Sequence, residues 1–514
     1  MTQATDSRLA PPRWEPPKPD WRGRLARVLP IVNVPLAIWY LSWLLSPNRP
    51  SQPVLYGLLV TAELFNMAQV LGFWWTLTTM GRREPKPPCT DRVKVDVFIP
   101  VYNEPVEIVE PTVAAATKLR TAEVRVHLLD DGGNPAMEAM ARRHGVNYVS
   151  RPSNEGAKAG NINWSLQRTD APFVAVLDCD HVPDPRFLEV TLAYFDEDRV
   201  AFVQTPQYYA NAGEGAIAEA SWAQQTLFFG TIAVGRDDLG AMFCCGTNVV
   251  FRRAALDAMG GFPTDSLTED FELSLRLHEA GWTSRYVPEV LASGLGPEDM
   301  ASYSSQQLRW ARGCLSALPR ILRARLPLKI RVNYLMSAAY WLTGWTLLIY
   351  MSFPVVRILT GDQPVTVASV DQFLVHWAPY FVTGLITVAL ASRGTYTFAA
   401  FALQSANFWI HIVASLLTLL RRKGSFAVTP KKGTSGRQFK PIRFPLAACA
   451  ILAGVSIYGL SRDQSPATVN NAAFALVHIT ILVSGMWPAL KGAPAEQVTE
   501  RAAEPAIGPV GPAL

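Results

Sequence analysis

Long apolar runs near both ends of the chain restrict its fold more than any other feature of the sequence. Residues 28–46 and 54–79 are each long enough to cross a lipid bilayer, which takes about 20 predominantly apolar residues. The stretch from about 90 to 325 reads instead as an ordinary soluble α/β protein. The sequence therefore predicts a membrane protein in which a soluble domain is inserted between membrane-spanning helices.

Four further runs after the soluble stretch are also long enough to span a bilayer. They lie at about 333–358, 373–391, 444–460 and 472–490. Together with the two N-terminal runs they give six predicted spans. Glu63 lies inside the second of these, where an acid either marks a functional position or faces a neighbouring helix.

The segment 397–420 is apolar as well, but the charges beside it argue against a seventh span. The following residues, 421–443, hold eight basic residues and no acidic one. Basic loops stay on the cytosolic side of a membrane, and this loop does so if 397–420 lies along the membrane surface. Gln404, Asn407 and His411 also suit an interfacial helix. We therefore expect six spans and a cytosolic soluble domain.

Charge and cysteine content exclude two other classes of protein. The net charge is +5, but the basic residues cluster beside the apolar runs, which indicates membrane orientation rather than nucleic-acid binding. The six cysteines show no CxxC spacing and no paired framework, so we expect reduced thiols. The first apolar run is long and has no clear cleavage site, and we expect no signal peptide.

Apolar strands alternate with helices in the first half of the soluble stretch. Strands are predicted at 93–104, 124–133 and 173–180, with a helix at about 135–144. Strands of near-continuous apolar character are typical of a parallel sheet with both faces covered. Ligands of such sheets bind beyond the carboxyl ends of the strands. The acidic residues that follow these strands therefore mark a predicted site.

The clearest of these acidic clusters ends the strand in "FVAVLDCDHVP" (173–183). Asp178 and Asp180 are two residues apart, so on an extended segment they face the same side. Hard carboxylate oxygens suit Mg²⁺ or Mn²⁺, whose other ligands are often phosphates. The alternative is a turn in which an aspartate caps the next helix. His181 is either a further ligand or a local hydrogen-bond partner.

Two more polar groups follow the same reasoning. Asp130 and Asp131 end the second strand, where they mark either a turn or a site for uracil or ribose. Lys158, flanked by glycines in "NEGAKAGNINW" (154–164), either neutralises a phosphate or is a solvated loop charge.

The second half of the soluble stretch adds an acidic and an aromatic motif. Thr268, Glu269 and Asp270 begin a predicted helix, where acids are favoured by the helix dipole and also serve as ordinary caps. In "YSSQQLRWARG" (303–313), Arg309 can pair with a diphosphate, and the Trp beside it can stack on a sugar ring. An amphipathic surface helix with a buried Trp is the alternative.

The order of these motifs is more specific than any one of them. DDG, DxD, TED and QxxRW follow one another between membrane helices, and this resembles the processive family-two glycosyltransferases, most closely bacterial cellulose synthase catalytic subunits. The resemblance covers about residues 55–490. Four stretches support the narrower match: "VYNEP" (101–105), "KAGNIN" (158–163), "VQTPQYY" (203–209) and "FAVTPK" (426–431), the last resembling a gating loop.

The resemblance implies a fold and a division of the chain. The fold is an α/β GT-A-type (Rossmann-like) cytosolic glycosyltransferase domain inserted in an α-helical transmembrane domain of about six spans. The implied division is a cytosolic tail (1–27), two membrane helices (28–80), the GT-A domain (90–300), interfacial amphipathic helices with QxxRW (300–330), two membrane helices (331–392), an interfacial helix (397–420), the gating loop (421–443), two membrane helices (444–490) and a disordered tail (491–514).

The resemblance also assigns roles to the candidate residues. Asp270 resembles the general base, and Asp178 and Asp180 resemble the pair that binds Mg²⁺ (or Mn²⁺) with the diphosphate. The implied substrate-binding residues are Asp130, Asp131, Lys158, Glu269, Gln306, Arg309 and Trp310, together with Phe426, Val428, Thr429 and Lys431 as a lid over the nucleotide.

The implied activity is a processive, inverting β-glucan synthase of the cell inner (plasma) membrane. It would polymerise glucose from UDP-glucose and translocate the product, most closely cellulose, a β-1,4-glucan. The implied partners are UDP-glucose, the growing glucan chain, the lipid bilayer and an accessory envelope or periplasmic subunit, with no nucleic acid.

Two departures from the family pattern keep alternatives open. About 24 residues follow the last predicted span and contain no RxxxR signature, so we do not expect activation through the family's cyclic-di-GMP-binding PilZ domain. The segment "VQTPQYYANA" (203–212) differs from the usual cellulose synthase pattern, which leaves a β-1,3-glucan (curdlan-like) synthase, a mixed-linkage synthase or a UDP-GlcNAc polymerase as alternatives. A non-catalytic nucleotide-sugar-binding membrane subunit is disfavoured by the intact acidic motifs.

Overall fold

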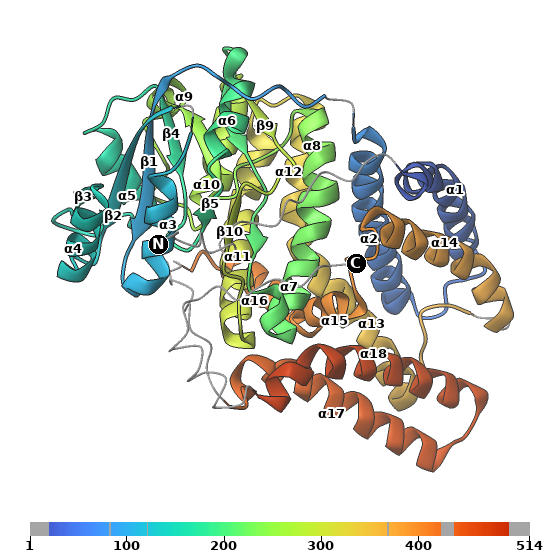
Figure 1. Cartoon of the computed structure of the whole chain (residues 1–514). Helices are drawn as coiled ribbons and strands as arrows, with labels where there is room; N and C mark the ends of the chain where they lie inside the picture. Colours follow the sequence, from blue (N-terminus) through green and yellow to red (C-terminus); the bar gives the residue numbers. More distant parts are fainter. Residues whose placement is uncertain (1–19, 82–83, 121, 367–369, 423–435, 493–514) are drawn as a thin grey trace.

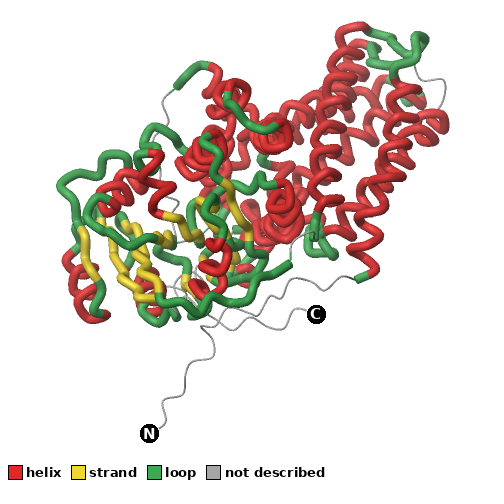
Figure 2. The backbone as a smooth tube through the Cα atoms, turned by 90° about the horizontal axis from the view of Figure 1, so that it is seen from above, coloured by secondary structure: helices red, strands yellow, loops and turns green. Residues whose placement is uncertain are grey.

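The structure of the chain is a computed structural model that describes residues 20–81, 84–120, 122–366, 370–422 and 436–492. Its strands gather at one end and long helices fill the other (Figure 2). The soluble domain and the helical domain predicted from the apolar runs are therefore both present.

Mixed strand directions distinguish the central sheet from the parallel sheet that the sequence predicts. The strands are β1 (Val93–Val101), β2 (Ala122–Asp130), β3 (Asn147–Val149), β4 (Phe173–Val176), β6 (Val200–Gln204), β8 (Val249–Arg252) and β9 (Thr283–Tyr286). Among the described residues they form one seven-stranded sheet in the order β3-β2-β1-β4-β8-β6-β9. β1 to β4 pair in parallel, as expected, but β8 is antiparallel to both β4 and β6. The alternation of strands and helices in the sequence contained no sign of this reversal.

A smaller sheet lies beside the large one. It consists of β5 (Val182–Pro183), β10 (Ala292–Gly294) and β7 (Tyr208–Tyr209), with β10 in the middle. β5 follows the DxD segment directly and pairs antiparallel with β10. This pairing brings the segment after Asp180 next to the strand that precedes the QxxRW helix.

Helices cover both faces of the large sheet, because successive side chains of a strand point to opposite sides. Val95, Val97 and Ile99 of β1 join one buried cluster, whereas Phe98 joins the other. The first cluster packs under α3 (Val106–Ala116), α4 (Pro135–His144) and α6 (Phe187–Leu192), and the second under α5 (Ala157–Leu166), α9 (Arg253–Met259) and α10 (Glu269–Glu279). Apolar burial on both faces fixes the sheet and thereby the loops at its carboxyl edge.

A buried ion network holds the opposite end of β1. Asp96 is completely buried and accepts hydrogen bonds from Arg253 (2.9 Å) and the Ala171 amide (3.0 Å). Its other carboxylate oxygen lies 2.9 Å from Arg125 Nε and 3.1 Å from His127 Nε2. The network joins β1, β2 and α9, so it ties three elements of the sheet layer together.

Six helices among the described residues are long and apolar enough to cross a membrane. They are α1 (Trp21–Leu44), α2 (Pro53–Thr79), the bipartite helix α12 (Leu328–Ala339) plus α13 (Thr343–Thr360), α14 (Val370–Ala391), α17 (Phe439–Arg462) and α18 (Pro466–Lys491). α1 packs against α14, and α17 pairs with α18 as a hairpin (Figure 1). The number agrees with the six spans expected from the sequence.

Two helices begin earlier than the apolar runs that predicted them. α1 starts at Trp21 rather than at 28, because the Asp20 carboxylate accepts a hydrogen bond from the Gly23 amide and caps the helix. α17 starts at Phe439, so the last residues of the predicted gating loop, 439–443, are helical. Apolar runs mark the part of a helix that suits lipid, whereas caps and polar turns extend the helix beyond it.

The ambiguous segment 397–420 folds as two helices, α15 (Phe398–Ala406) and α16 (Phe408–Leu419), bent by 41° relative to each other. Counted as one broken span, this pair would be a seventh, and its placement along the membrane surface stays a prediction. α13 and α18 pack against this pair from two sides, so closely that the backbones are in contact. A Cβ on Gly344 of α13 would lie 2.2 Å from the Phe408 carbonyl oxygen, and one on Gly485 of α18 would lie 2.0 Å from that of Ala402. Glycine is required at both positions.

Glu63 faces a neighbouring helix. The Tyr350 hydroxyl on α13 donates a hydrogen bond to its carboxylate (3.1 Å), and the Asn66 side chain donates to the same tyrosine oxygen (3.0 Å). Of the two readings that the sequence allowed, the structure thus supports an interhelical contact. These side chains join α2 to α13.

The elements between the sheet and the membrane helices complete the fold. They are α7 (Ala216–Leu227), the π-helical turn η4 (Phe228–Ile232), α8 (Ala233–Leu239), α11 (Met300–Arg323) and the short helical turns η2 (Ala193–Asp196), η3 (Ala212–Glu214) and η5 (Tyr340–Leu342). α7, η4 and α8 run end to end along the membrane helices, and α11 crosses below the sheet (Figure 1). The soluble domain and the helical domain therefore share one continuous packing region.

The Asp96 network generates a stability prediction. Asp96→Ala should destabilise the soluble domain by about 3–5 kcal/mol, because it leaves the Arg253 guanidinium, which is 11% exposed, without its carboxylate partner. The thermal unfolding midpoint of the purified protein is the measurement. Asp170→Ala is the matched control, since Asp170 also pairs with Arg125 but is 79% exposed, and exposed pairs contribute little. Equal midpoints for the two variants would contradict the assignment.

Candidate active site

A cavity of about 290 Å³ opens beyond the carboxyl ends of β1, β2 and β4, where the sequence places the site. Its walls come from the loops after these strands, the start of α5, the start of α10 and the middle of α11. Nine of the predicted site residues line it together: Asp131, Lys158, Asp178, Asp180, Glu269, Asp270, Gln306, Arg309 and Trp310.

Asp130 does not belong to this set. Its carboxylate is buried and accepts hydrogen bonds from the Gly132 amide, the Asn134 amide and the Tyr148 hydroxyl, each at 2.8 Å. It is not among the residues that line the cavity, and its contacts hold the turn that presents Asp131. Its predicted role in substrate binding stays a prediction.

The predicted lid residues are not part of the described structure. Phe426, Val428, Thr429 and Lys431 lie outside the described residues, so their predicted role stays a prediction.

Asp131 is held by an arginine that the sequence reasoning missed. Arg151 donates to both of its carboxylate oxygens, from Nε at 2.5 Å and from Nη2 at 2.6 Å, and both side chains are 6% exposed. The same guanidinium also donates to the Ala157 carbonyl (2.9 Å). Arg151 follows the short edge strand β3, and its place after a parallel strand was the signal that could have identified it.

Asp178, Asp180 and His181 form a group that could hold a metal ion. One ligand atom from each lies within 4.8 Å of the others. His181 Nδ1 lies 3.4 Å from Asp180 Oδ1, while its Nε2 is buried and has no hydrogen-bond partner within the part of the chain that the structure describes. Two carboxylates and an imidazole fit Mn²⁺ or Mg²⁺, and a bound ion would satisfy the nitrogen that is otherwise buried without a partner.

Lys158 pairs with the DxD segment. Its ammonium lies 2.5 Å from Asp178 and donates to the Gly246 carbonyl at 2.7 Å. Burial alone would lower the pKa of Lys158, but the carboxylates of Asp178 and Glu269 raise it above the usual value. The residue is therefore a firmly charged cation at the floor of the cavity, and the reading of a solvated loop charge is excluded.

The surroundings of Asp270 raise the pKa of its carboxyl group. It begins α10, as the sequence predicts, and burial raises its pKa to about 7, with a further rise from the neighbouring Glu269 charge. The Phe271 amide, Lys158 and Arg309 oppose part of this rise. A carboxyl group that titrates near neutral pH is suited to take a proton during a reaction.

The QxxRW helix is seated directly on the start of α10. A Cβ on Gly313 of α11 would lie 2.3 Å from the Thr268 side chain, so this close approach requires glycine. The contact turns Gln306, Arg309 and Trp310, one to two turns earlier on α11, into the cavity beside Asp270. Two motifs that are separate in the sequence, TED (268–270) and QxxRW (306–310), thus form adjoining walls.

Comparison with known proteins supports this reading of the site. Residues 173–417 match the family described as "Glycosyl transferase family group 2". The chain is 30% identical to "Cellulose synthase 1" of Komagataeibacter xylinus over 91% of its own length, but spans 32% of that relative. It is 31% identical to the "Cellulose synthase catalytic subunit [UDP-forming]" of Xanthomonas axonopodis pv. citri, over 90% of this chain and 67% of the relative. The chain thus spans about a third of the first relative.

A solved structure supports the fold. The mannosyltransferase PcManGT from Pyrobaculum calidifontis, in complex with GDP-Man and Mn²⁺, superposes with a TM-score of 0.53 over 72% of this chain and all of that one. At 17% identity the likeness shows the GT-A-type fold alone. The identity to the cellulose synthase subunits carries the family assignment, and the six apolar helices agree with a multi-pass membrane protein. The chain therefore belongs to the processive, cellulose synthase-like family-two glycosyltransferases.

Proposed function

We propose that the chain polymerises glucose from UDP-glucose into a β-glucan, most consistent with β-1,4-linked cellulose, and passes the polymer through its membrane helices. The observation that carries the proposal is one cavity in which the acidic motifs and QxxRW meet, in a chain related to UDP-forming cellulose synthase subunits. The proposal includes a cytosolic catalytic domain and helices in the inner membrane. The cluster of Arg22, Arg24, Arg27 and Arg393 at the domain end of α1 and α14 supports this orientation.

The donor is proposed to lie across the floor of the cavity. Asp131, oriented by Arg151, would accept a hydrogen bond from the nucleoside. Lys158 and Arg309 supply positive charge for the diphosphate. Asp178, Asp180 and His181 would hold a divalent ion, which neutralises charge on the departing diphosphate when it is bound.

Asp270 is proposed as the general base. It takes the proton of the acceptor hydroxyl while the acceptor oxygen forms a bond to the anomeric carbon of glucose. The bond between that carbon and the β-phosphate oxygen breaks, and UDP leaves with the electron pair. Attack from the face opposite UDP inverts an α-linked donor into a β-linkage, and no covalent sugar–enzyme intermediate is needed.

The acceptor end is proposed to rest on Trp310. Its indole lines the cavity on α11, and a flat aromatic face suits the apolar face of a sugar ring. α11 packs against α16 and, less extensively, α17. A polymer that leaves the cavity beside α11 would thus enter the helical region directly.

The activity test is incorporation of radiolabelled glucose from UDP-glucose by the purified chain, followed by linkage-specific glucanases. We expect a polymer digested by a β-1,4-glucanase. Asp270→Asn should lower synthesis by about 10²–10⁴-fold, the usual contribution of a general base, and leave UDP binding intact. Asp265→Asn is the matched control on an 82% exposed side chain and should leave synthesis unchanged. Digestion by a β-1,3-glucanase instead, or incorporation from UDP-GlcNAc, would assign a different product.

The pH dependence follows from the environment of Asp270. Because a base acts when ionised and the pKa of Asp270 is raised to about 7, kcat/KM should be low in acid and rise through about pH 7 to a plateau. Glu269→Gln removes one of the two causes of the raised pKa and should move this rise to lower pH. A pH profile of kcat/KM for both proteins is the measurement. An unmoved midpoint in Glu269→Gln would show that another group controls the profile.

The metal site predicts a dependence on divalent ions. Removal of metal with EDTA should abolish synthesis, and added Mg²⁺ or Mn²⁺ should restore it. His181→Ala should weaken Mn²⁺ binding, measured by electron paramagnetic resonance of the purified protein, by about 10–100-fold. His144→Ala is the control, because His144 of α4 pairs with Glu110 of α3, away from the cavity. Unchanged Mn²⁺ affinity in His181→Ala would leave that residue a hydrogen-bond partner of Asp180.

A further inference from the structure

An ion pair in the cavity of the candidate active site joins two groups that have separate tasks in the proposed function. The Lys158 ammonium lies 2.5 Å from Asp178 Oδ1 and donates to the Gly246 carbonyl at 2.7 Å. Asp178 is also one of the three side chains that could hold a metal ion, together with Asp180 and His181. One of the candidate metal ligands thus already contacts a cation, and that cation belongs to the protein.

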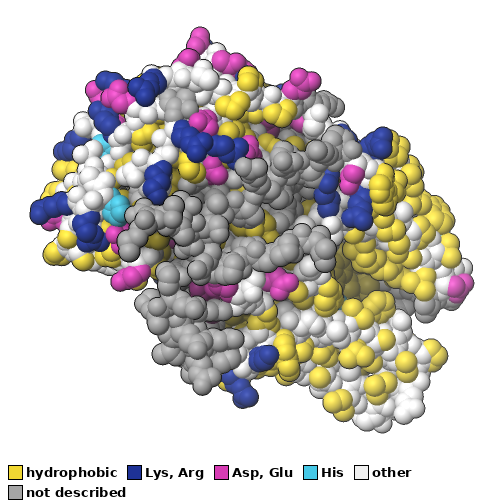
Figure 3. All heavy atoms as spheres, viewed as in Figure 1, with side chains coloured by type: hydrophobic (Ala, Val, Ile, Leu, Met, Phe, Trp, Pro, Cys, Tyr) yellow, Lys and Arg dark blue, Asp and Glu magenta, His cyan; other side chains and the backbone are white. Residues whose placement is uncertain are grey.

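Lys158 differs from the charged residues on the outside of the soluble domain. There, basic and acidic side chains lie interspersed on an open surface, where water weakens the interactions between them (Figure 3). The Lys158 side chain is only 17% exposed, and the side chain of Asp180, in the same metal-binding group as Asp178, is 1% exposed. Charges with so little contact with water interact strongly, so the cation next to Asp178 affects the whole group.

The loop that accepts the second hydrogen bond of the lysine also keeps the ammonium near the candidate base. A Cβ on Gly246, whose φ is +84°, would lie 2.9 Å from Asp270 Oδ2. Only glycine suits both the left-handed backbone and this close approach. Lys158 is therefore held near Asp270 as well as on Asp178. Glu269 adds a further carboxylate charge that attracts it.

The ammonium and a metal ion compete for the same carboxylate. A divalent ion held by Asp178 and Asp180 would lie next to the ammonium, and like charges repel strongly in a site that is shielded from water. The lysine has a flexible four-carbon stem and three N–H donors, so it can turn from Asp178 to the oxygens of a diphosphate in the same cavity. An anionic diphosphate removes the conflict, because it gives the ammonium a new acceptor.

We propose that Lys158 takes the place of the metal ion on Asp178 in the free enzyme, and that it moves to the diphosphate when nucleotide and ion bind together. The lysine offsets part of the acidic charge as long as no substrate is bound. It also makes the two ligands depend on each other, because the nucleotide withdraws the ammonium and the ion can then bind. This inference rests on the diphosphate site of the proposed function, but not on which sugar is transferred.

Titration of the detergent-purified full chain with Mn²⁺, followed by electron paramagnetic resonance, tests the proposal. Without nucleotide, Lys158→Met should bind Mn²⁺ more tightly than the unmodified chain, by about 5–150-fold, the usual range of coupling between two ligands of one protein. Added UDP should strengthen Mn²⁺ binding less in the variant than in the unmodified chain, because no ammonium remains to be withdrawn. Equal Mn²⁺ affinities of the two proteins without nucleotide would overturn the proposal.

An Asp178→Asn background separates this exchange from general repulsion between positive charges. If the ammonium acts through Asp178, adding Lys158→Met in this background should leave the Mn²⁺ affinity unchanged. An equal rise in both backgrounds would show repulsion at a distance and would overturn the exchange. No Mn²⁺ binding to the unmodified chain, with or without UDP, would overturn the metal site of the proposed function as well.

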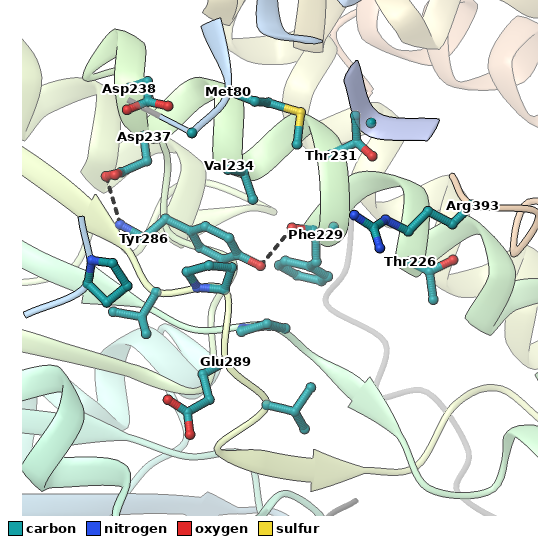
Figure 4. A pocket seen from close by; sticks show the side chains of 18 of the residues that line it. Met80, Thr226, Phe229, Thr231, Val234, Asp237, Asp238, Tyr286, Glu289 and Arg393 are labelled. Atoms are coloured by element: carbon teal, nitrogen blue, oxygen red, sulfur yellow. Dashed lines mark hydrogen bonds between the residues drawn. The ribbon is translucent and has the colours of Figure 1, made fainter. Parts of the chain in front are cut away.

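The matched control is a lysine–aspartate pair of the same length outside the active site. Lys86 lies 2.5 Å from Asp196 and lines a second cavity, of about 600 Å³, between the soluble domain and the membrane helices (Figure 4). Figure 4 shows another compensated charge of this cavity, Asp237, which accepts a hydrogen bond from the Tyr286 amide at 2.9 Å. Lys86→Met should leave the Mn²⁺ affinity unchanged, both with and without UDP.

Thermal unfolding gives a second readout that remains useful if the variant is less stable. Lys158→Met removes the charge that offsets the acids, so its thermal midpoint without metal should lie below that of the unmodified chain. Mn²⁺ should raise the midpoint of the variant by more than that of the unmodified chain, because the ion supplies the missing positive charge. A smaller rise in the variant than in the unmodified chain would also overturn the proposal.

Discussion

The candidate catalytic cavity depends on one partly buried ammonium group. Lys158 lies against Asp178 and the Gly246 carbonyl, and it feels the charges of Glu269 and Asp270. These acids come from two segments that are remote in sequence, and bringing them together without a cation would be costly in a buried site. The lysine offsets this repulsion in the free protein. It also leaves Asp270 with a raised pKa, because its charge compensates the cluster only in part.

The membrane helices and the site are built as one unit rather than as a domain on an anchor. α11 forms a wall of the catalytic cavity and also packs against α16 of the helical region. α8 packs just as closely on α2, since a Cβ on Gly235 would lie 2.0 Å from the Thr76 carbonyl oxygen. Soluble and membrane parts therefore meet through helix backbones, and under the proposed function this geometry would give a nascent polymer a short path between them.

Much of the site was predictable, because its chemistry is concentrated in short motifs at element ends. DxD, TED and QxxRW in this order are a specific combination of motifs, and residues of all three line the cavity. The role of Asp130 was not predictable, because the sequence does not show which of the two adjacent aspartates accepts hydrogen bonds from the amides of the turn. In the structure it is Asp130. Arg151 was missed because its pairing with Asp131 joins two loops through space.

The fold was predictable to a similar depth. The length of the apolar runs identified the six spans. The first residue of α1 is set instead by the Asp20 cap, and the length of an apolar run does not reveal such a local contact. The antiparallel β8 was missed because strand direction depends on the path of the chain through α7 and α8.

The glycines at 344 and 485 have a mechanical consequence for the helical region. They hold the α15–α16 elbow between two helices through backbone contacts, which contain no side chain that could rotate aside. By contrast, α2 meets α13 through Glu63, Asn66 and Tyr350, whose hydrogen bonds can lengthen or exchange. If the helical bundle must widen as successive sugars pass, we expect α2 and α13 to move apart, while the α15–α16 elbow keeps its position.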